Sequence, residues 1–270
     1  MSPSPPRRAR STAPSVQAPR HGLARVLSKL GVCSRSQAEH WVRAGRVSVD
    51  GRAILDPYHP TLIDRQTLAV DGQVVAAAEG VYVVFNKPRG QVVSAADERG
   101  RATVYTALAD AGLPWLGPVG RLDKASEGLL LLSNDTNWAA GITSPASHLE
   151  KTYHVQVSGQ PDAAVLAAMQ SGVVDAGDTL RARRASWLRA GEKNTWLEVV
   201  LDEGRNRHIR RLLGVLGFDV MRLIRVAIGP LRLGELPKGQ WRRLSDEEVH
   251  SLAPAAMRRP QAPPGAVKPG

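Results

Sequence analysis

The chain has 270 residues, of which 43% are hydrophobic, and a formal net charge of +11. This length is enough for two modest domains with their own cores, and no apolar run approaches the ~20 residues that a membrane span requires. The single cysteine, Cys33, excludes an internal disulfide and a thiolate metal cluster. We therefore expect a cytoplasmic protein that does not associate with membranes.

The positive charge is concentrated in three segments. Residues 1–20 carry +4, residues 21–46 carry +4 and residues 254–270 carry +3, so that residues 47–253 sum to zero. The first and last of these segments are rich in proline and contain no acidic residue, which predicts two disordered basic tails. Charge focused in this way favours a polyanionic partner such as a nucleic acid, the alternative being an ordinary basic protein.

Residues 21–78 are predicted to begin with two helices. Four apolar residues share one face of the first helix: Leu23, Val26, Leu27 and Leu30. Gly31 would end this helix. Ser36 followed by Glu39 is a capping-box pattern that would start a second helix, and Gly45 would stop it.

Short alternating strands follow, separated by Asp-Gly turns at 50–51 and 71–72. The whole pattern resembles the small alpha-L RNA-binding module that is best known from a small-subunit ribosomal protein. The resemblance implies that the helix pair presents four basic residues to a phosphate backbone: Arg25, Lys29, Arg35 and Arg43. The alternative is a pair of ordinary helices with solvated basic faces.

Residues 79–253 are predicted to form a second, α+β domain after a linker at 76–80. Strands are expected at 81–85, 129–132, 151–157, 195–201 and 222–228, with helices at 163–169 and from near Asn206. Irregular interleaving with short turns favours a largely antiparallel mixed sheet over a doubly wound fold. The sequence contains no glycine-rich nucleotide loop and no histidines at metal-ligand spacing, so neither a cofactor nor a metal is expected.

The most informative stretch is 119–135, VGRLDKASEGLLLLSND. Asp123 lies in a polar loop at the entrance to an apolar strand, where a rigid element can hold a reactive group. The alternative is that Asp123 is a solvated turn residue or a helix cap.

A cluster of arginines in 203–211, EGRNRHIRR, precedes a helix with a buried apolar face. With ~100° between successive residues, Arg207 and Arg211 would point away from the core and Arg210 would lie on its flank. A partly buried arginine needs an anionic partner, and Asp123 is a candidate. Alternatively the run is an RNA-facing stripe, which Arg205, Arg207 and Arg211 would form.

The ordered combination of GRLDKASEGLLLLSND, KTYHV and EGRNRHIRR behind the alpha-L-like module resembles the bacterial ribosomal-RNA pseudouridine synthases. The resemblance covers nearly everything between the tails. It implies that Asp123 is the catalytic aspartate, that Tyr153 packs on the target base and that Arg210 pairs with the aspartate. The implied substrate-binding residues are Arg121, beside a flipped nucleotide, Leu223 as an apolar wall, Leu122 and Lys87.

Two positions depart from the family pattern, with Ser126 in place of threonine and His208 in place of glutamine. The resemblance implies an enzyme that isomerises a specific uridine of ribosomal RNA, a reaction that oxidises nothing and requires no cofactor. A monomer is the default expectation. Asp123 would attack the base, attack the sugar or remove a sugar proton. The large subunit is the favoured target, and the small subunit is the alternative.

A function from another class also fits the basic segments, namely a non-catalytic RNA-binding factor for ribosome assembly. The ordered set of aspartate, tyrosine and arginine argues against it. A DNA-binding regulator is less favoured, because neither a recognition helix nor a dimer seam is evident in the sequence.

Overall fold

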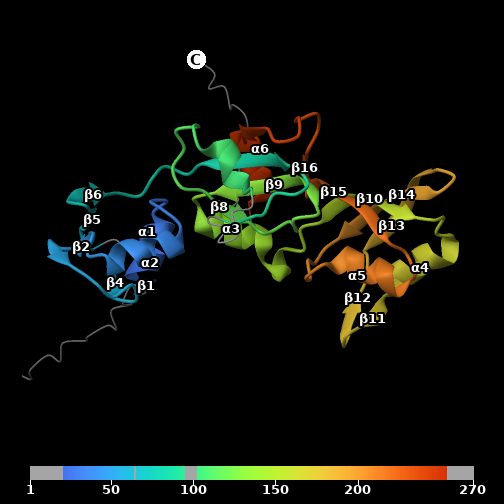
Figure 1. Cartoon of the computed structure of the whole chain (residues 1–270), viewed down its shortest axis with the longest axis horizontal. Coiled ribbons are helices and arrows are strands. Elements are labelled where there is room, and N and C mark those ends of the chain that lie inside the picture. The colour runs from blue at the N-terminus through green and yellow to red at the C-terminus, as the bar shows by residue number, and fades with distance from the viewer. Residues whose placement is uncertain (1–20, 64, 95–101, 254–270) are drawn as a thin grey trace, which may run out of the picture. The chain divides into compact units, whose positions relative to one another are not determined.

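The computed structural model describes residues 21–63, 65–94 and 102–253 (Figure 1). Both predicted basic tails lie outside these residues. The chain divides into two compact units, of which the first includes residues up to Leu27 and Arg35–Ala76. The second includes Ser28–Ser34 and the residues from Ala77 onward. Within the described ranges, no helix has the length and apolar character needed to cross a membrane.

Two helices open the described chain, α1 (Leu23–Lys29) and α2 (Arg35–Arg43). The apolar face of α1 is buried, as its spacing predicted, and Gly31 follows it with φ of 73°. The predicted capping box is wrong, because α2 begins at Arg35 and Ser36 already lies inside it. The Glu39 carboxylate instead forms ion pairs with Arg35 at 3.4 Å and with Arg43 at 3.5 Å.

The described residues of the first unit form short strands: β1 (His21–Gly22), β2 (Val47–Val49), β3 (Arg52–Ala53), β4 (Pro60–Thr61), β5 (Leu68–Val70) and β6 (Gln73–Val75). A four-stranded sheet has the order β3-β2-β5-β6, and β1 pairs with β4. Both Asp-Gly turns form as predicted. Positive φ angles of 51° and 79° at 50–51 and of 50° and 81° at 71–72 fit the hairpin turns that these dipeptides favour.

The second unit is built on a nine-stranded sheet with the main order β13-β14-β10-β15-β9-β7-β17. Its strands are β7 (Tyr82–Lys87), β8 (Gly117–Val119), β9 (Glu127–Ser133), β10 (Lys151–Ser158), β13 (Arg184–Ala190), β14 (Asn194–Leu201), β15 (Val220–Ile228), β16 (Leu231–Arg232) and β17 (Trp241–Arg243). The β9–β15 pairing is parallel, whereas the other pairings in this sheet are antiparallel. This arrangement confirms the predicted α+β class and largely antiparallel sheet.

Strand β9 is buried along its whole length, which explains its run of four leucines. Leu129 and Leu131 pack in one cluster with residues of α3 (Thr136–Thr143). Leu130 and Leu132 pack in another cluster on the opposite side. Since β9 is held on both faces and by strands on both edges, the loop that leads into it starts from a rigid element.

A second core lies where α4 (Ala163–Ser171) and α5 (His208–Val215) cover one face of β10, β14 and β15 (Figure 1). The hairpin of β11 (Val173–Asp175) and β12 (Asp178–Leu180) contacts α5. The remaining elements are α6 (Asp246–Leu252) and the 3-10 helices η1 (Val104–Leu108) and η2 (Pro145–Ser147). A cavity lies on this face of the sheet, beside the start of α5.

Candidate active site

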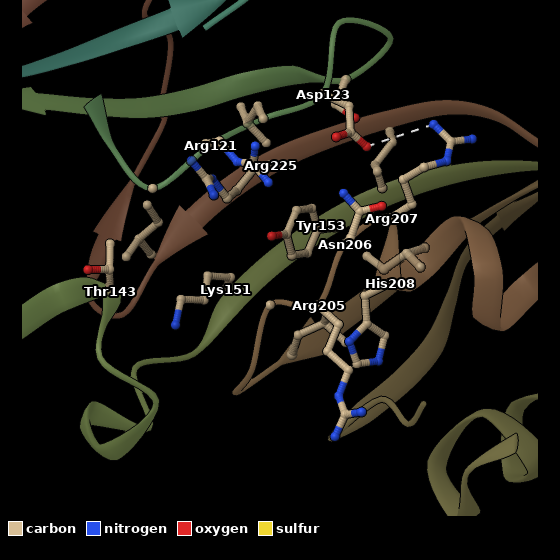
Figure 2. Close-up of a pocket in the computed structure, with 18 of the residues that line it drawn as sticks. Arg121, Asp123, Thr143, Lys151, Tyr153, Arg205, Asn206, Arg207, His208 and Arg225 are labelled. Atoms are coloured by element: carbon tan, nitrogen blue, oxygen red, sulfur yellow. Dashed lines mark ion pairs between the residues drawn. The ribbon is translucent and has the colours of Figure 1, made fainter. Parts of the chain in front are cut away.

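A cavity of about 340 Å³ opens in the second unit (Figure 2). Its walls come from the loop before β9, the end of α3, the start of β10, the segment before α5 and the middle of β15. Asp123, Tyr153, Arg121, Leu122 and Leu223 all line it. Five predicted side chains from three separate segments of the chain are thus brought to one place.

The Asp123 loop is fixed by hydrogen bonds to its backbone. The Ser126 amide donates to the Asp123 carbonyl at 2.9 Å, and Ser126 is buried. Below the loop, Lys87 Nζ donates to the Ser126 carbonyl at 2.8 Å. From the side of α5, Arg210 Nη2 donates to the Ala125 carbonyl at 3.3 Å. These contacts hold the carboxylate of Asp123 at the cavity, with 38% of its side chain exposed.

Among the residues that the structure describes, Asp123 forms its ion pair with Arg207, with 4.0 Å between Nη1 and Oδ2 (Figure 2). The sequence pointed to Arg210 instead, and this interpretation requires correction. Arg207 is not yet in the helix but is its N-cap residue in a left-handed conformation, with φ of 50°. Helical phasing therefore does not apply to it, and its side chain turns toward the loop.

The side chain of Arg210 contributes to the site by donating hydrogen bonds to backbone carbonyl groups. Besides Ala125, it donates from Nη1 to the Val220 carbonyl at 2.8 Å. Burial lowers the pKa of Arg210, Arg207 adds to the lowering, and Asp123 acts in the opposite direction. Arg210 therefore lies within electrostatic reach of Asp123, while its hydrogen bonds tie the Asp123 loop to the start of β15.

Tyr153 lies on β10 opposite Arg225 of β15, and its ring faces the cavity (Figure 2). The ring also packs against two apolar clusters, the one under α4 and α5 and the one that contains Leu130 and Leu132. Leu122 and Leu223 are buried and add apolar wall beside it. The cavity thus combines an aromatic face, an apolar wall and a carboxylate.

The structure contradicts the prediction that Lys87 binds substrate. Strand β7 extends through Lys87, which is fully buried and does not line the cavity. Its Nζ donates to the carbonyls of Pro88 at 3.1 Å and Ser126 at 2.8 Å. Burial lowers its pKa to about 8, against the opposing influence of Glu127 and Asp123. Lys87 supports the loop from below.

The basic residues before α5 have different environments. Arg205 lines the cavity and pairs with Asp178 at 2.7 Å. Arg211 does not face outward as predicted, because it is bound by Asp175 at 2.5 Å and by Asp178 at 3.0 Å. Its guanidinium holds the β11–β12 hairpin to α5 and is engaged within the protein.

On the first two helices, the side chains of Arg35 and Arg43 are more than half exposed even though both pair with Glu39. Arg25 of α1 is also exposed, whereas Lys29 is partly buried. Three of the four basic residues assigned to RNA contact are therefore accessible on their helices.

Sequence reasoning missed Lys151, Arg225 and His208 as cavity residues. Lys151 and Tyr153, like Leu223 and Arg225, are two residues apart on strands, so the alternation of side chains would have placed each pair on one face. His208 is buried, and burial is the main cause that lowers its pKa. Among the residues that the structure describes, no group of three or more His, Cys, Asp or Glu is placed to hold a metal.

The two units match two classes of known domain. The sequence profile of the S4 domain matches residues 22–60, and that of RNA pseudouridylate synthase matches residues 81–214. A small RNA-binding domain thus precedes a domain of an RNA-modifying isomerase.

The chain belongs to the RNA pseudouridine synthase family. An uncharacterised RNA pseudouridine synthase of Rickettsia prowazekii (strain Madrid E) is 35% identical over 226 residues, which cover 83% of this chain and 94% of the relative. The ribosomal large subunit pseudouridine synthase B of Escherichia coli O6:H1 is 36% identical over 238 residues, covering 85% and 81%. A crystal structure of a pseudouridylate synthase superposes with a TM-score of 0.59 at 28% identity and covers 87% of this chain and all of that one. These findings confirm the resemblance seen in the sequence.

Proposed function

We propose that this enzyme isomerises one uridine of large-subunit ribosomal RNA to pseudouridine, with Asp123 as the catalytic carboxylate. The observation that carries the proposal is that Asp123 and Tyr153, from distant segments, line one cavity. Relatives called ribosomal large subunit pseudouridine synthase B, with 36% and 35% identity, support the choice of subunit.

The reaction breaks the N-glycosidic bond between uracil and ribose, rotates the uracil and rejoins it to the ribose through a carbon atom. The starting base is stacked in RNA, and flipping it out costs a few kcal/mol. Stacking of a base on an aromatic ring contributes about 1–3 kcal/mol, which Tyr153 would supply. The carboxylate of Asp123 then faces the extracted nucleotide beside Arg121, while Leu122 and Leu223 exclude water around it.

The S4 domain would increase the affinity for RNA without taking part in the chemical step. The exposed guanidinium groups of Arg25, Arg35 and Arg43 are suited to phosphate contacts. One chain supplies Asp123, Arg207 and Tyr153 to the cavity, so we propose a monomer as the active form. With ribosomal RNA as substrate, the cytoplasm is the proposed place of action.

The test is a carbodiimide map of purified large- and small-subunit rRNA transcripts after incubation with the protein. We expect one new primer-extension stop, in the large-subunit transcript. A stop in the small-subunit transcript alone would assign the alternative target. The absence of a stop in both would contradict the proposed reaction and favour an assembly factor that only binds RNA.

A further inference from the structure

One end of the cavity gathers three cations: Arg121, Lys151 and Arg225. In the view of Figure 2 they lie on one side of Tyr153, with Arg207 on the other. Asp123 is the one acid among the described lining residues, and its ion pair is with Arg207. Within the described part of the chain, none of the three cations has an ion pair to a carboxylate. This end of the cavity therefore carries positive charge that the protein itself leaves uncompensated.

Arg225 is the most buried of the three, with 6% exposed. Its Nε donates to the Leu129 carbonyl at 2.7 Å, whereas its buried Nη2 has no hydrogen-bond partner among the described residues. A buried charged group with an unused donor is costly unless a partner satisfies it. The position of Arg225 is set by the parallel pairing of β15 with β9, where a Cβ on Gly128 would come within 2.3 Å of the Arg225 carbonyl.

Lys151 begins β10 and lies two residues before Tyr153, so both side chains project from the same face of the strand. Its pKa is lowered first by burial and then by Arg225, while Asp202 acts in the opposite direction. Asp202 itself lies 3.7 Å from Arg183. Lys151 and Arg225 therefore repel each other at this end of the cavity, and a bound anion would relieve this repulsion.

We propose that Lys151, Arg225 and Arg121 form a subsite for one backbone phosphate of the RNA strand, next to the nucleotide that stacks on Tyr153. This inference rests on the proposed function and adds a contact that fixes the strand at the cavity. Phosphate oxygens accept hydrogen bonds from guanidinium and ammonium groups, and such charge-assisted bonds are the strong ones. The phosphate would accept hydrogen bonds from the part of the Arg225 guanidinium that lines the cavity, and the ammonium group of Lys151 would help to neutralise the phosphate charge.

The experiment combines protein variants with RNA in which single phosphates are replaced by uncharged methylphosphonates. The probe is the shortest synthetic hairpin of large-subunit rRNA that the protein binds with full affinity, selected by binding alone. Wild type is compared with Lys151→Gln, Lys151→Arg and the matched control Lys193→Gln. Lys193 is exposed and lies outside this cavity. Thermal melting checks that each variant is folded.

At one phosphate position, the replacement should weaken binding to wild type and to Lys193→Gln by about tenfold, the scale of a charge-assisted hydrogen bond. The same replacement should have no further effect on Lys151→Gln, and Lys151→Arg should restore the sensitivity. The proposal is overturned if Lys151→Gln responds like wild type at every position.

The proposed function is measured separately, as pseudouridine formation by wild type on the unmodified hairpin. If the wild-type protein formed no pseudouridine, the proposed reaction would be contradicted, whereas the binding comparison would still test the phosphate subsite. For an active wild type, Lys151→Gln should raise KM and leave kcat close to that of wild type. A loss of kcat at unchanged KM would overturn the phosphate role, because Lys151 would then act in the chemical step.

Discussion

Arg207 and Asp123 form an ion pair at the cavity, with 4.0 Å between Arg207 Nη1 and Asp123 Oδ2. Both side chains remain partly exposed, at 53% and 38%. Ion pairs of this kind contribute about 0–1 kcal/mol to stability. The pair therefore orients the carboxylate and adds little to the stability of the fold. Arg210 instead ties the backbone of the Asp123 loop to the start of β15.

These two roles predict losses of stability of different size for two matched substitutions. Arg207→Met should lower the free energy of unfolding by less than about 1 kcal/mol. Arg210→Met removes the donors to Val220 and Ala125 and should lower it by about 1–3 kcal/mol. Urea unfolding measures both, and equal losses would contradict the assignment.

The buried Lys87 predicts a specific pH dependence. Burial lowers its pKa to about 8, whereas an unfolded lysine titrates near 10.4. Between these values the unfolded chain holds the extra proton, so stability attributable to Lys87 rises with pH. The difference in unfolding free energy between wild type and Lys87→Met should increase from pH 8 to pH 10. The exposed Lys124→Met is the control, and a flat difference for Lys87 would refute the claim.

Glu127 is buried and is held by Arg222 at 3.0 Å and Lys238 at 2.5 Å. Burial raises its pKa, but these two cations outweigh burial and bring it below the ordinary glutamate value. The stability from this group is present above that ordinary value and is lost as the pH falls through the folded pKa. Glu127→Gln should cost about 3 kcal/mol at neutral pH.

The pH profile checks this assignment. The cost of Glu127→Gln should shrink as the pH falls below 4.5, the ordinary glutamate value. Glu247→Gln, which changes an exposed glutamate, should cost little at any pH. A cost for Glu127→Gln that stays constant into acid would rule out the ionised pair as its source.

The exposed cations of the S4 domain are expected to affect the salt dependence of RNA affinity but not the rate of the chemical step. Arg43→Gln removes an exposed cation of α2, so the slope of log affinity against log salt should fall by about 0.7 for one single-strand phosphate contact. The kcat at saturating RNA should stay unchanged. Arg52→Gln, an exposed residue of β3, removes the same charge and serves as the comparison. An unchanged slope for Arg43→Gln would exclude it from the RNA contact.

The elements that the sequence predicted correctly are those whose sequence pattern lies within a few neighbouring residues. The four-leucine strand and the Asp-Gly hairpins carry their patterns within a few residues. The β11–β12 hairpin, α3 and α6 were missed. Arg211 was misplaced with them, because Asp175 and Asp178 reach it only once the hairpin folds onto α5.

The same limit applies within the site. Asp123 and Tyr153 came together as expected because each has a fixed place on a strand or at its entrance. Arg207 took the ion pair expected of Arg210, because Arg207 has a left-handed backbone and lies outside the helical phase. Lys87 was misassigned because β7 continues two residues beyond the strand expected at 81–85.

The most direct test is release of tritium from RNA labelled at C5 of uridine, since reattachment through that carbon displaces its hydrogen. Asp123→Asn is compared with wild type and with Asp110→Asn, which changes an exposed aspartate outside the cavity. We predict that Asp123→Asn binds the RNA with wild-type affinity and releases tritium at least about 10²-fold more slowly, while Asp110→Asn matches wild type. Tritium release by Asp123→Asn at the wild-type rate would contradict the assignment of the reaction to this carboxylate.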